Sequence, residues 1–297
     1  MTKEYKVDYY SILGFVGFAI LTVFIWRFYY GYYILYPFTI MGTWFHEMGH
    51  GIMSMLVGGD FVKLEIFPNG SGLAHSRYND SDFYFNKNIA LSMVTAAGLF
   101  GPPIVGSILI LMSKSFKKSK IILYILSISM LLSVAIWMRS IVGLMLVLFV
   151  AFFLLFIISR SKSIVVKILI QLVGVLNCVY IYKKIGFLYT EKVTVGVIVI
   201  LFLGVLLLLI AFKSRPIIQQ LVVQIIGIMA CVDTYKQIGY LYTERVTVGG
   251  QEESWSDTGS IAAQLGMTYS FWGTLILIIS FVMLIYSLYL RNRTLVE

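Results

Sequence analysis

Residues 40–59 read IMGTWFHEMGHGIMSMLVGG, an apolar stretch that contains two histidines and one glutamate and ends in a pair of glycines. On a helix, residues four apart share one face, so His46 and His50 point two imidazoles at the same place. The spacing His-Glu-x-x-His is typical of a Zn²⁺ site in which the glutamate is the general base. The stretch therefore predicts a helix with His46 and His50 as metal ligands and Glu47 as the catalytic base.

The composition of the whole chain indicates a membrane protein. Of its 297 residues, 59% are hydrophobic and only 12% are charged, whereas a water-soluble domain carries about 25% charge. The net charge of +9 comes from short basic clusters between apolar runs, an arrangement that fits loops facing anionic lipid headgroups better than a nucleic-acid surface. We expect a single integral membrane domain over 1–297, which contacts the lipid bilayer, binds no nucleic acid and spans the cell membrane several times.

Apolar runs give the number of spans. A bilayer core of about 30 Å needs roughly 20 apolar residues in a helix, and by this measure the chain has about nine spans. The predicted fold class is an all-α polytopic membrane protein. The spans are expected at 9–30, 33–57, 88–112, 121–137, 141–159, 164–182, 193–212, 216–242 and 269–290.

Two segments do not fit the pattern of a simple span. Residues 60–78 alternate apolar and polar side chains around a Pro-Asn-Gly-Ser-Gly turn, which predicts a small β-hairpin after the His-Glu-x-x-His helix. Residues 243–268 are polar and acidic, and we interpret them as a loop followed by a short amphipathic helix. Residues 33–112, with the hairpin at 60–78, are the expected metal-site core.

The chain also contains an internal repeat with an offset of 53 residues. Residues 171–196 align without gaps on residues 224–249, and 16 of the 26 positions are identical. The duplicated units are expected at 160–212 and 213–263, and each consists of a helix and a loop. A residue that is present in only one of the two copies is one that the other copy does not need.

At these motifs the sequence resembles a known family. HEMGH, followed by GIMSMLVGGDFVKLEIFPNGSGLA, is similar to the site-2 proteases, intramembrane zinc metallopeptidases, and in particular to their B-like branch. The glycine- and proline-rich run 96–106 and the Ser-Asp motif in 255–259 add to the likeness, which is close over 40–110 and loose over 216–275. The resemblance implies Zn²⁺-dependent hydrolysis of peptide bonds in membrane-protein or peptide substrates.

A catalytic zinc has three protein ligands and an open position for water, and the resemblance implies that the third ligand is an Asp on a later transmembrane helix. Asp233 is the leading candidate because it is the only Asp well within an apolar run, and Tyr180 takes its place in the first repeat copy. Asp257, in the Ser-Asp motif, is the alternative. His75 and Glu65 on the hairpin are further candidates.

The hairpin also has a predicted role in substrate docking. A membrane-spanning substrate arrives as a helix whose backbone bonds are satisfied internally, so cleavage needs something that stabilises an unwound stretch. The strand at 61–67 can pair with such a stretch by β-addition. Val62, Leu64 and Ile66 are the expected docking residues.

The leading functional hypothesis is an intramembrane zinc metalloprotease, and two alternatives stay open. A polytopic transporter or metal-binding permease is suggested by the repeat and by polar groups within apolar runs, namely Lys167, Gln171, Gln219, Gln220 and Gln224. A protease-derived scaffold that binds partners without cleaving them is the other alternative. The presence of Glu47 favours the protease, since a scaffold has no use for a general base.

Overall fold

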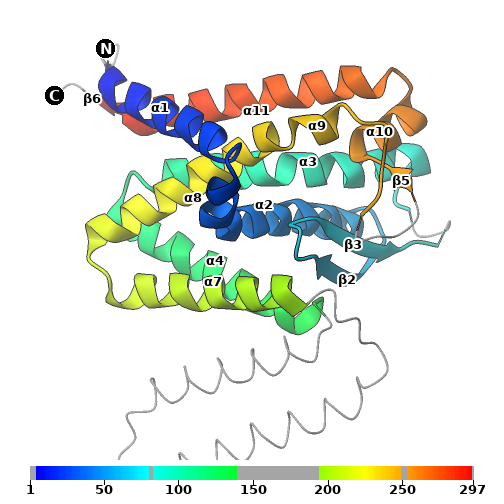
Figure 1. Cartoon of the computed structure of the whole chain (residues 1–297), viewed down its shortest axis with the longest axis horizontal. Helices are drawn as coiled ribbons and strands as arrows, with labels where there is room; N and C mark the ends of the chain where they lie inside the picture. The colour runs from blue at the N-terminus through cyan, green and yellow to red at the C-terminus, as the bar shows by residue number, and fades with distance from the viewer. Residues whose placement is uncertain (1–4, 80–82, 139–193, 249–252, 296–297) are drawn as a thin grey trace, which may run out of the picture.

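The computed structural model describes residues 5–79, 83–138, 194–248 and 253–295. This part of the chain is mostly helical, as the sequence predicts (Figure 1). The helices are α1 (Tyr9–Ile25), α2 (Tyr29–Leu56), α3 (Lys87–Met112), α4 (Phe116–Ile136), α7 (Thr194–Lys213), α8 (Pro216–Lys236), α9 (Ile238–Leu241), α10 (Asp257–Leu265) and α11 (Tyr269–Asn292).

Four of the described helices are long and apolar enough to cross a membrane, namely α3, α4, α8 and α11. Helices α1 and α7 are apolar but shorter. The predicted spans 141–159 and 164–182 lie outside the described residues, so the count of nine stays a prediction. Two boundaries are wrong. The span expected at 9–30 ends at Ile25, because α2 already begins at Tyr29. The span expected at 216–242 ends at Lys236, and after Gln237 the chain continues as the separate short helix α9.

The predicted hairpin is confirmed. Strands β2 (Asp60–Ile66) and β3 (Gly72–Arg77) pair antiparallel, and the turn between them is closed by a hydrogen bond from the Phe67 amide to the Ser71 carbonyl. Gly70 in this turn has a φ of 85°, a conformation that glycine adopts without strain. Two smaller antiparallel pairs are β1 (Tyr5–Val7) with β6 (Arg293–Leu295) and β4 (Arg245–Val246) with β5 (Ser254–Trp255).

Local sequence signals mark where several helices begin. The Asn86 side chain accepts hydrogen bonds from the first amides of α3, Ser256 caps α10, and Thr268 caps α11. Each of these side chains satisfies an amide that has no partner inside the helix. Helix α8 starts with Pro216, whose missing N–H costs nothing at this position.

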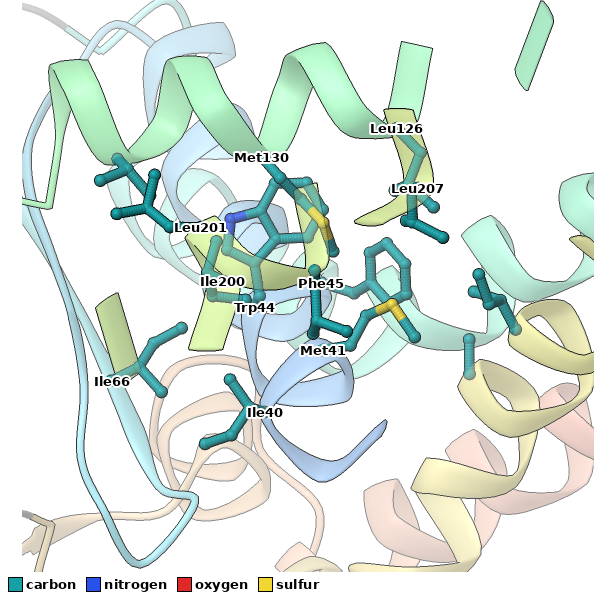
Figure 2. Packing of buried hydrophobic residues seen from close by; sticks show 14 of the residues in the cluster. Ile40, Met41, Trp44, Phe45, Ile66, Leu126, Met130, Ile200, Leu201 and Leu207 are labelled. Atoms are coloured by element: carbon teal, nitrogen blue, oxygen red, sulfur yellow. The ribbon is translucent and has the colours of Figure 1, made fainter. Parts of the chain in front are cut away.

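The apolar face of α2 packs against α4, α7 and the hairpin (Figure 2). Trp44 anchors this contact, because its indole N–H donates to the Ser133 hydroxyl at 2.8 Å. The side chains in the cluster include Ile40, Met41, Trp44 and Phe45 of α2, Leu126 and Met130 of α4, Ile200, Leu201 and Leu207 of α7, and Ile66 of β2. This packing fixes the rotation of α2 about its axis and so the direction in which its polar residues point.

Small residues bring α3 close to two neighbouring helices. A Cβ on Gly49 would collide with the Ala97 carbonyl, and one on Gly101 would lie 2.6 Å from the Phe45 carbonyl oxygen. Farther along α3, a Cβ on Gly106 would lie 2.5 Å from the carbonyl oxygen of α8 residue Gly227. Close backbone approach through small residues is the usual way in which membrane helices pack.

The two ends of the helical bundle differ (Figure 1). The β1–β6 pair joins both termini at one end, whereas the hairpin, β5 and α10 gather at the other. The polar residues of α2 lie toward the hairpin end. The candidate site is therefore at the end of the bundle away from the termini.

Candidate metal centre

The two histidines of α2 lie side by side, as the spacing predicts. Their Nε2 atoms are 3.0 Å apart. The Nδ1 atom of His50 lies 2.8 Å from the Val94 carbonyl oxygen, and because a carbonyl only accepts hydrogen bonds, this nitrogen carries the proton. The lone pair of a neutral His50 is thus on Nε2, which faces His46. Gly98 of α3 makes room for this ring, since a Cβ there would collide with the imidazole.

Asp257 lies beside His46 and His50 and is the third residue of a possible metal-binding group. Its Oδ2 atom lies 2.9 Å from Nε2 of His46 and 3.5 Å from Nε2 of His50. Within the part of the chain that the structure describes, His46, His50 and Asp257 form the set of side chains that could hold a metal ion, with ligand atoms all within 4.8 Å of one another. His46 is buried and the other two are partly buried.

The loop after α9 positions Asp257 at the first residue of α10. The Ser256 amide donates to the Glu244 carbonyl at 2.9 Å, and the Ser256 hydroxyl donates to the Thr243 carbonyl. The same hydroxyl accepts from the Gly259 amide at 3.0 Å. Gly259 has no space for a Cβ, because one would collide with the Glu244 carbonyl. Ser256 of the Ser-Asp motif thus caps α10 and is hydrogen-bonded to the backbone of residues 243–244.

The charge state of Asp257 suits a metal ligand. Burial alone would raise the pKa of this carboxyl, but the nearby His50 and His46 rings outweigh burial and hold the pKa well below its usual range. Asp257 is therefore an anion at neutral pH. Its Oδ2 atom is buried and accepts no other hydrogen bond.

The structure places Asp257, the alternative candidate, beside the imidazoles, whereas Asp233, the leading candidate, is not among the ligand atoms that lie within 4.8 Å of one another. Its carboxylate lies against Gly42, where a Cβ would be 2.6 Å from Cγ of Asp233, and Gly42 is one helical turn before His46. The Gln237 amide nitrogen donates to Asp233 Oδ2 at 2.5 Å, and Lys236 Nζ is 3.8 Å from Oδ1. Asp233 is buried in α8, as expected, but at a different level of the bundle from the histidines.

Glu47 lies beside the three converging side chains and is held by the hairpin. It is buried, with 6% of its surface exposed, and it lines the same cavity as Ala74 of β3. A Cβ on Gly72 would lie 2.6 Å from Cγ of Glu47. The Thr43 hydroxyl donates to the Gly70 carbonyl at 2.5 Å, which fastens the hairpin turn to α2.

A cavity of about 270 Å³ opens onto the site between the hairpin and the β4–β5 segment. Strand β3 lines this cavity, whereas the expected docking residues of β2 do not. Leu64 and Ile66 are fully buried in the core, and the Leu64 amide already donates to the Trp137 carbonyl at 3.0 Å. Val62 is likewise absent from the lining, so β3 and none of Val62, Leu64 and Ile66 borders this cavity. The lining consists of His46, Glu47, His50, Gly72, Leu73, Ala74, Ser76, Tyr78, Val94, Thr95, Tyr240, Val246, Val248, Ser254, Trp255 and Asp257.

The remaining ligand candidates pair with each other. Nε2 of His75 lies 2.6 Å from Oε2 of Glu65, and Nζ of Lys63 lies 2.5 Å from the other oxygen. Neither His75 nor Glu65 lines the cavity. They form a separate charged cluster on the hairpin.

A second, larger cavity is apolar and has no residue in common with the site. Its volume is about 620 Å³, and it lies between α2, α3 and α4. Its lining includes Trp44, Met48 and Ile104 but no acid or histidine. Of these two cavities, only the smaller one is therefore lined by acids and histidines.

Two contributors to the site were missed in the sequence. Gly98, which makes room for His50, lies in the small-residue run 96–106, and small residues in such a run are expected for helix packing alone. Tyr240 lies at the wall of the cavity, and its ring centroid is 6.4 Å from that of His46. The repeat carried a signal for this tyrosine, because the first copy has Phe187 at the matching position.

The comparison with known families agrees with the geometry. The family model for peptidase M50B-like proteins matches residues 15–195 and 185–287. Among curated proteins and solved structures, none matches the chain. The matched segments cover most of the sequence, including α2, the hairpin, α3, α8 and α10. The chain therefore belongs to the peptidase M50B-like family of the site-2 proteases, a family of membrane metallopeptidases.

Proposed function

We propose that this protein is a zinc-dependent endopeptidase that cleaves membrane-associated polypeptides. The observation that carries the proposal is the convergence of His46, His50 and Asp257 on one point beside Glu47. Two imidazole nitrogens and one carboxylate oxygen are a donor set that Zn²⁺ prefers, and three protein ligands leave a position open for water. Family membership gives the same class of chemistry.

The residues present fit the metal. The bond from His50 Nδ1 to the Val94 carbonyl leaves Nε2 as a lone-pair donor, and such a partner on the second ring nitrogen is a regular feature of metal-binding histidines. Asp257 offers a buried oxygen with no hydrogen bond of its own. When bound, zinc supplies Lewis acidity, which makes water a nucleophile at neutral pH and polarises a carbonyl.

Glu47 is the proposed general base and acid of the reaction. It accepts one proton from the attacking water while the water oxygen bonds to the scissile carbonyl carbon, and it returns that proton to the amide nitrogen as the carbon–nitrogen bond breaks. The close approach of Gly72 limits where its carboxylate can lie. Its burial keeps bulk water away from the transferring proton.

Strand β3 is the proposed docking strand for substrate. It pairs with β2 along one edge, and within the described residues no other strand pairs with it. Residues 72–74 line the cavity next to Glu47. An extended substrate segment added to β3 would exchange its lost helical hydrogen bonds for bonds to this edge.

Two of the polar residues that suggested a permease make contacts between or at the ends of the described helices. The Gln219 amide donates to the Ala211 carbonyl at 3.0 Å and so caps the end of α7, while Gln224 accepts from Arg291 at 2.8 Å. These groups are used in helix packing. Lys167 and Gln171 lie outside the described residues.

Replacement of Glu47 by Gln tests the proposal. Gln keeps the size of the side chain and both histidines, so the variant should retain zinc and lose cleavage. The membrane proteome of cells with wild-type protein should contain fragments of a membrane protein that accumulates uncleaved in cells with Glu47→Gln. Cleavage of that protein at the wild-type rate by purified Glu47→Gln would refute the assignment of the base. Transport activity that survives the change, with no uncleaved protein accumulating, would favour the permease.

A further inference from the structure

Tyr240 is the one phenol that contacts a member of the metal-binding group within the described residues. It is in the short helix α9, and its hydroxyl oxygen accepts a hydrogen bond from the Asp257 amide at 3.2 Å. The Tyr240 ring also lies beside the ring of His46, with 6.4 Å between the two centroids. One side chain thus contacts two members of the metal-binding group, the backbone of Asp257 and the ring of His46.

This hydrogen bond holds the start of α10 against α9. The Asp257 amide is one of the first amides of α10 and has no acceptor within the helix, so the Tyr240 oxygen supplies the acceptor. The amide held in this way belongs to the residue whose Oδ2 atom faces the two imidazoles.

We propose that Tyr240 is a positioning residue that holds Asp257 in place for metal binding. This inference rests on the proposed function. A hydrogen-bonded partner that fixes a metal ligand contributes substantially to metal affinity, and its loss costs about 10- to 100-fold. Tyr240 lies in α9, the short helix that follows the end of α8 at Lys236.

The internal repeat supports a role for the hydroxyl separately from the ring. Phe187 in the first copy preserves the ring and lacks the hydroxyl, and the first copy is not followed by a Ser-Asp motif. In the second copy, the Tyr240 ring packs beside the apolar cluster of Leu99, Leu241 and Ile261. In the second copy, the ring contributes to this packing. The hydroxyl is present only in the copy that also contains Asp257.

The test compares wild-type protein with Tyr240→Phe, which removes only the oxygen. Tyr242→Phe is the matched control, because its hydroxyl pairs with Thr274 at 2.8 Å on the exposed surface and not with the site. Full-length protein in detergent is stripped of metal and titrated with Zn²⁺ against a chromophoric chelator, and the unfolding temperature of the metal-free protein is recorded for each variant. Tyr240→Phe should bind Zn²⁺ roughly 10- to 100-fold more weakly, with an unchanged metal-free unfolding temperature, and Tyr242→Phe should bind like the wild type.

Two results would overturn the inference. Wild-type zinc affinity in Tyr240→Phe would do so, and if its cleavage rate were nevertheless reduced, the hydroxyl would act on the substrate and not on Asp257. A loss of affinity matched by an equal loss in Tyr242→Phe would reveal a general effect of removing a hydroxyl. If wild-type protein itself takes up no zinc, the proposed function fails, which is a different outcome from the failure of Tyr240 alone.

Discussion

Asp257 and His46 lie in contact, with 2.9 Å between Oδ2 and Nε2, although α2 and α10 are far apart in the sequence. Helix α3 joins the two, because it packs along α2 through Gly49 and Gly101 and also contacts α10. The hydrogen bonds of Ser256 then hold the start of α10 in a position from which Asp257 faces the imidazoles. The metal-binding set that we propose is thus a property of the tertiary fold.

The two acids should behave differently when each is replaced by Asn. Asp257→Asn removes a proposed ligand and should weaken zinc binding by roughly 100-fold or more, since the loss of supporting partners alone reaches that size. Asp233→Asn should leave zinc affinity unchanged, because its carboxylate contacts Gly42, Lys236 and Gln237 and no member of the group. Chelator competition on both purified variants measures this. Zinc loss in Asp233→Asn with retention in Asp257→Asn would reverse the assignment.

Gly98→Ala should disturb the metal centre from the α3 side. The added Cβ would collide with the His50 ring, so the imidazole must move and zinc affinity should fall by about 10-fold or more. Gly17→Ala in α1 is the control, because nothing lies within 4 Å of a Cβ there. Equal zinc affinity in the two alanine variants would show that His50 is not held as described.

Gly72→Ala should separate catalysis from metal binding. Its Cβ would lie 2.6 Å from Cγ and 2.7 Å from Oε1 of Glu47, which displaces the base while both histidines stay in place. Cleavage of a substrate identified with Glu47→Gln should slow by about 100-fold, within the range that general bases contribute, and zinc content should stay at the wild-type level. Gly239→Ala, with open space around the new methyl group, is the matched control. A Gly72→Ala enzyme as fast as this control would contradict the proposed role of the hairpin.

The charged cluster on the hairpin should make stability depend on pH. Burial alone would raise the pKa of Glu65, but the hydrogen bonds from His75 and Lys63 outweigh it and lower the pKa below the usual value. The stabilisation is therefore present above the unfolded-state pKa of about 4.3 and is lost as the pH falls through the lower folded-state value. Thermal unfolding at pH 6 and at about pH 3.5 should show a smaller acid-induced loss in Glu65→Gln than in wild type. An equal loss in both would show that this cluster does not contribute.

Much of the local structure was predictable because it depends on short-range patterns. The i, i+4 histidines, the Pro-Asn-Gly-Ser-Gly hairpin turn and the short helix near Asp257 each follow from a few consecutive residues, and the structure confirms the hairpin and the helix. The family was also recognisable from these motifs, and the family match confirms it.

The sequence did not single out the acid that the structure places beside the two histidines. The cost of burying a charge pointed to Asp233, which is indeed buried with 1% of its surface exposed, but burial does not say which helix face or which level a side chain occupies. Asp257 lies in the polar segment 243–268, and only the likeness of its Ser-Asp motif to the family pointed to it. Strand β3 was missed as the cavity wall for a similar reason, since which edge of a hairpin faces a site depends on how the hairpin docks.

The most direct test of the whole account is the metal content of full-length protein, purified in mild detergent and never exposed to a chelator. Wild-type protein should carry about one Zn²⁺ per chain by elemental analysis, and His46→Ala and His50→Ala should each lose most of it. Folded wild-type protein that contains no transition metal, or full zinc content in both histidine variants, would contradict the central claim that these side chains form a zinc site.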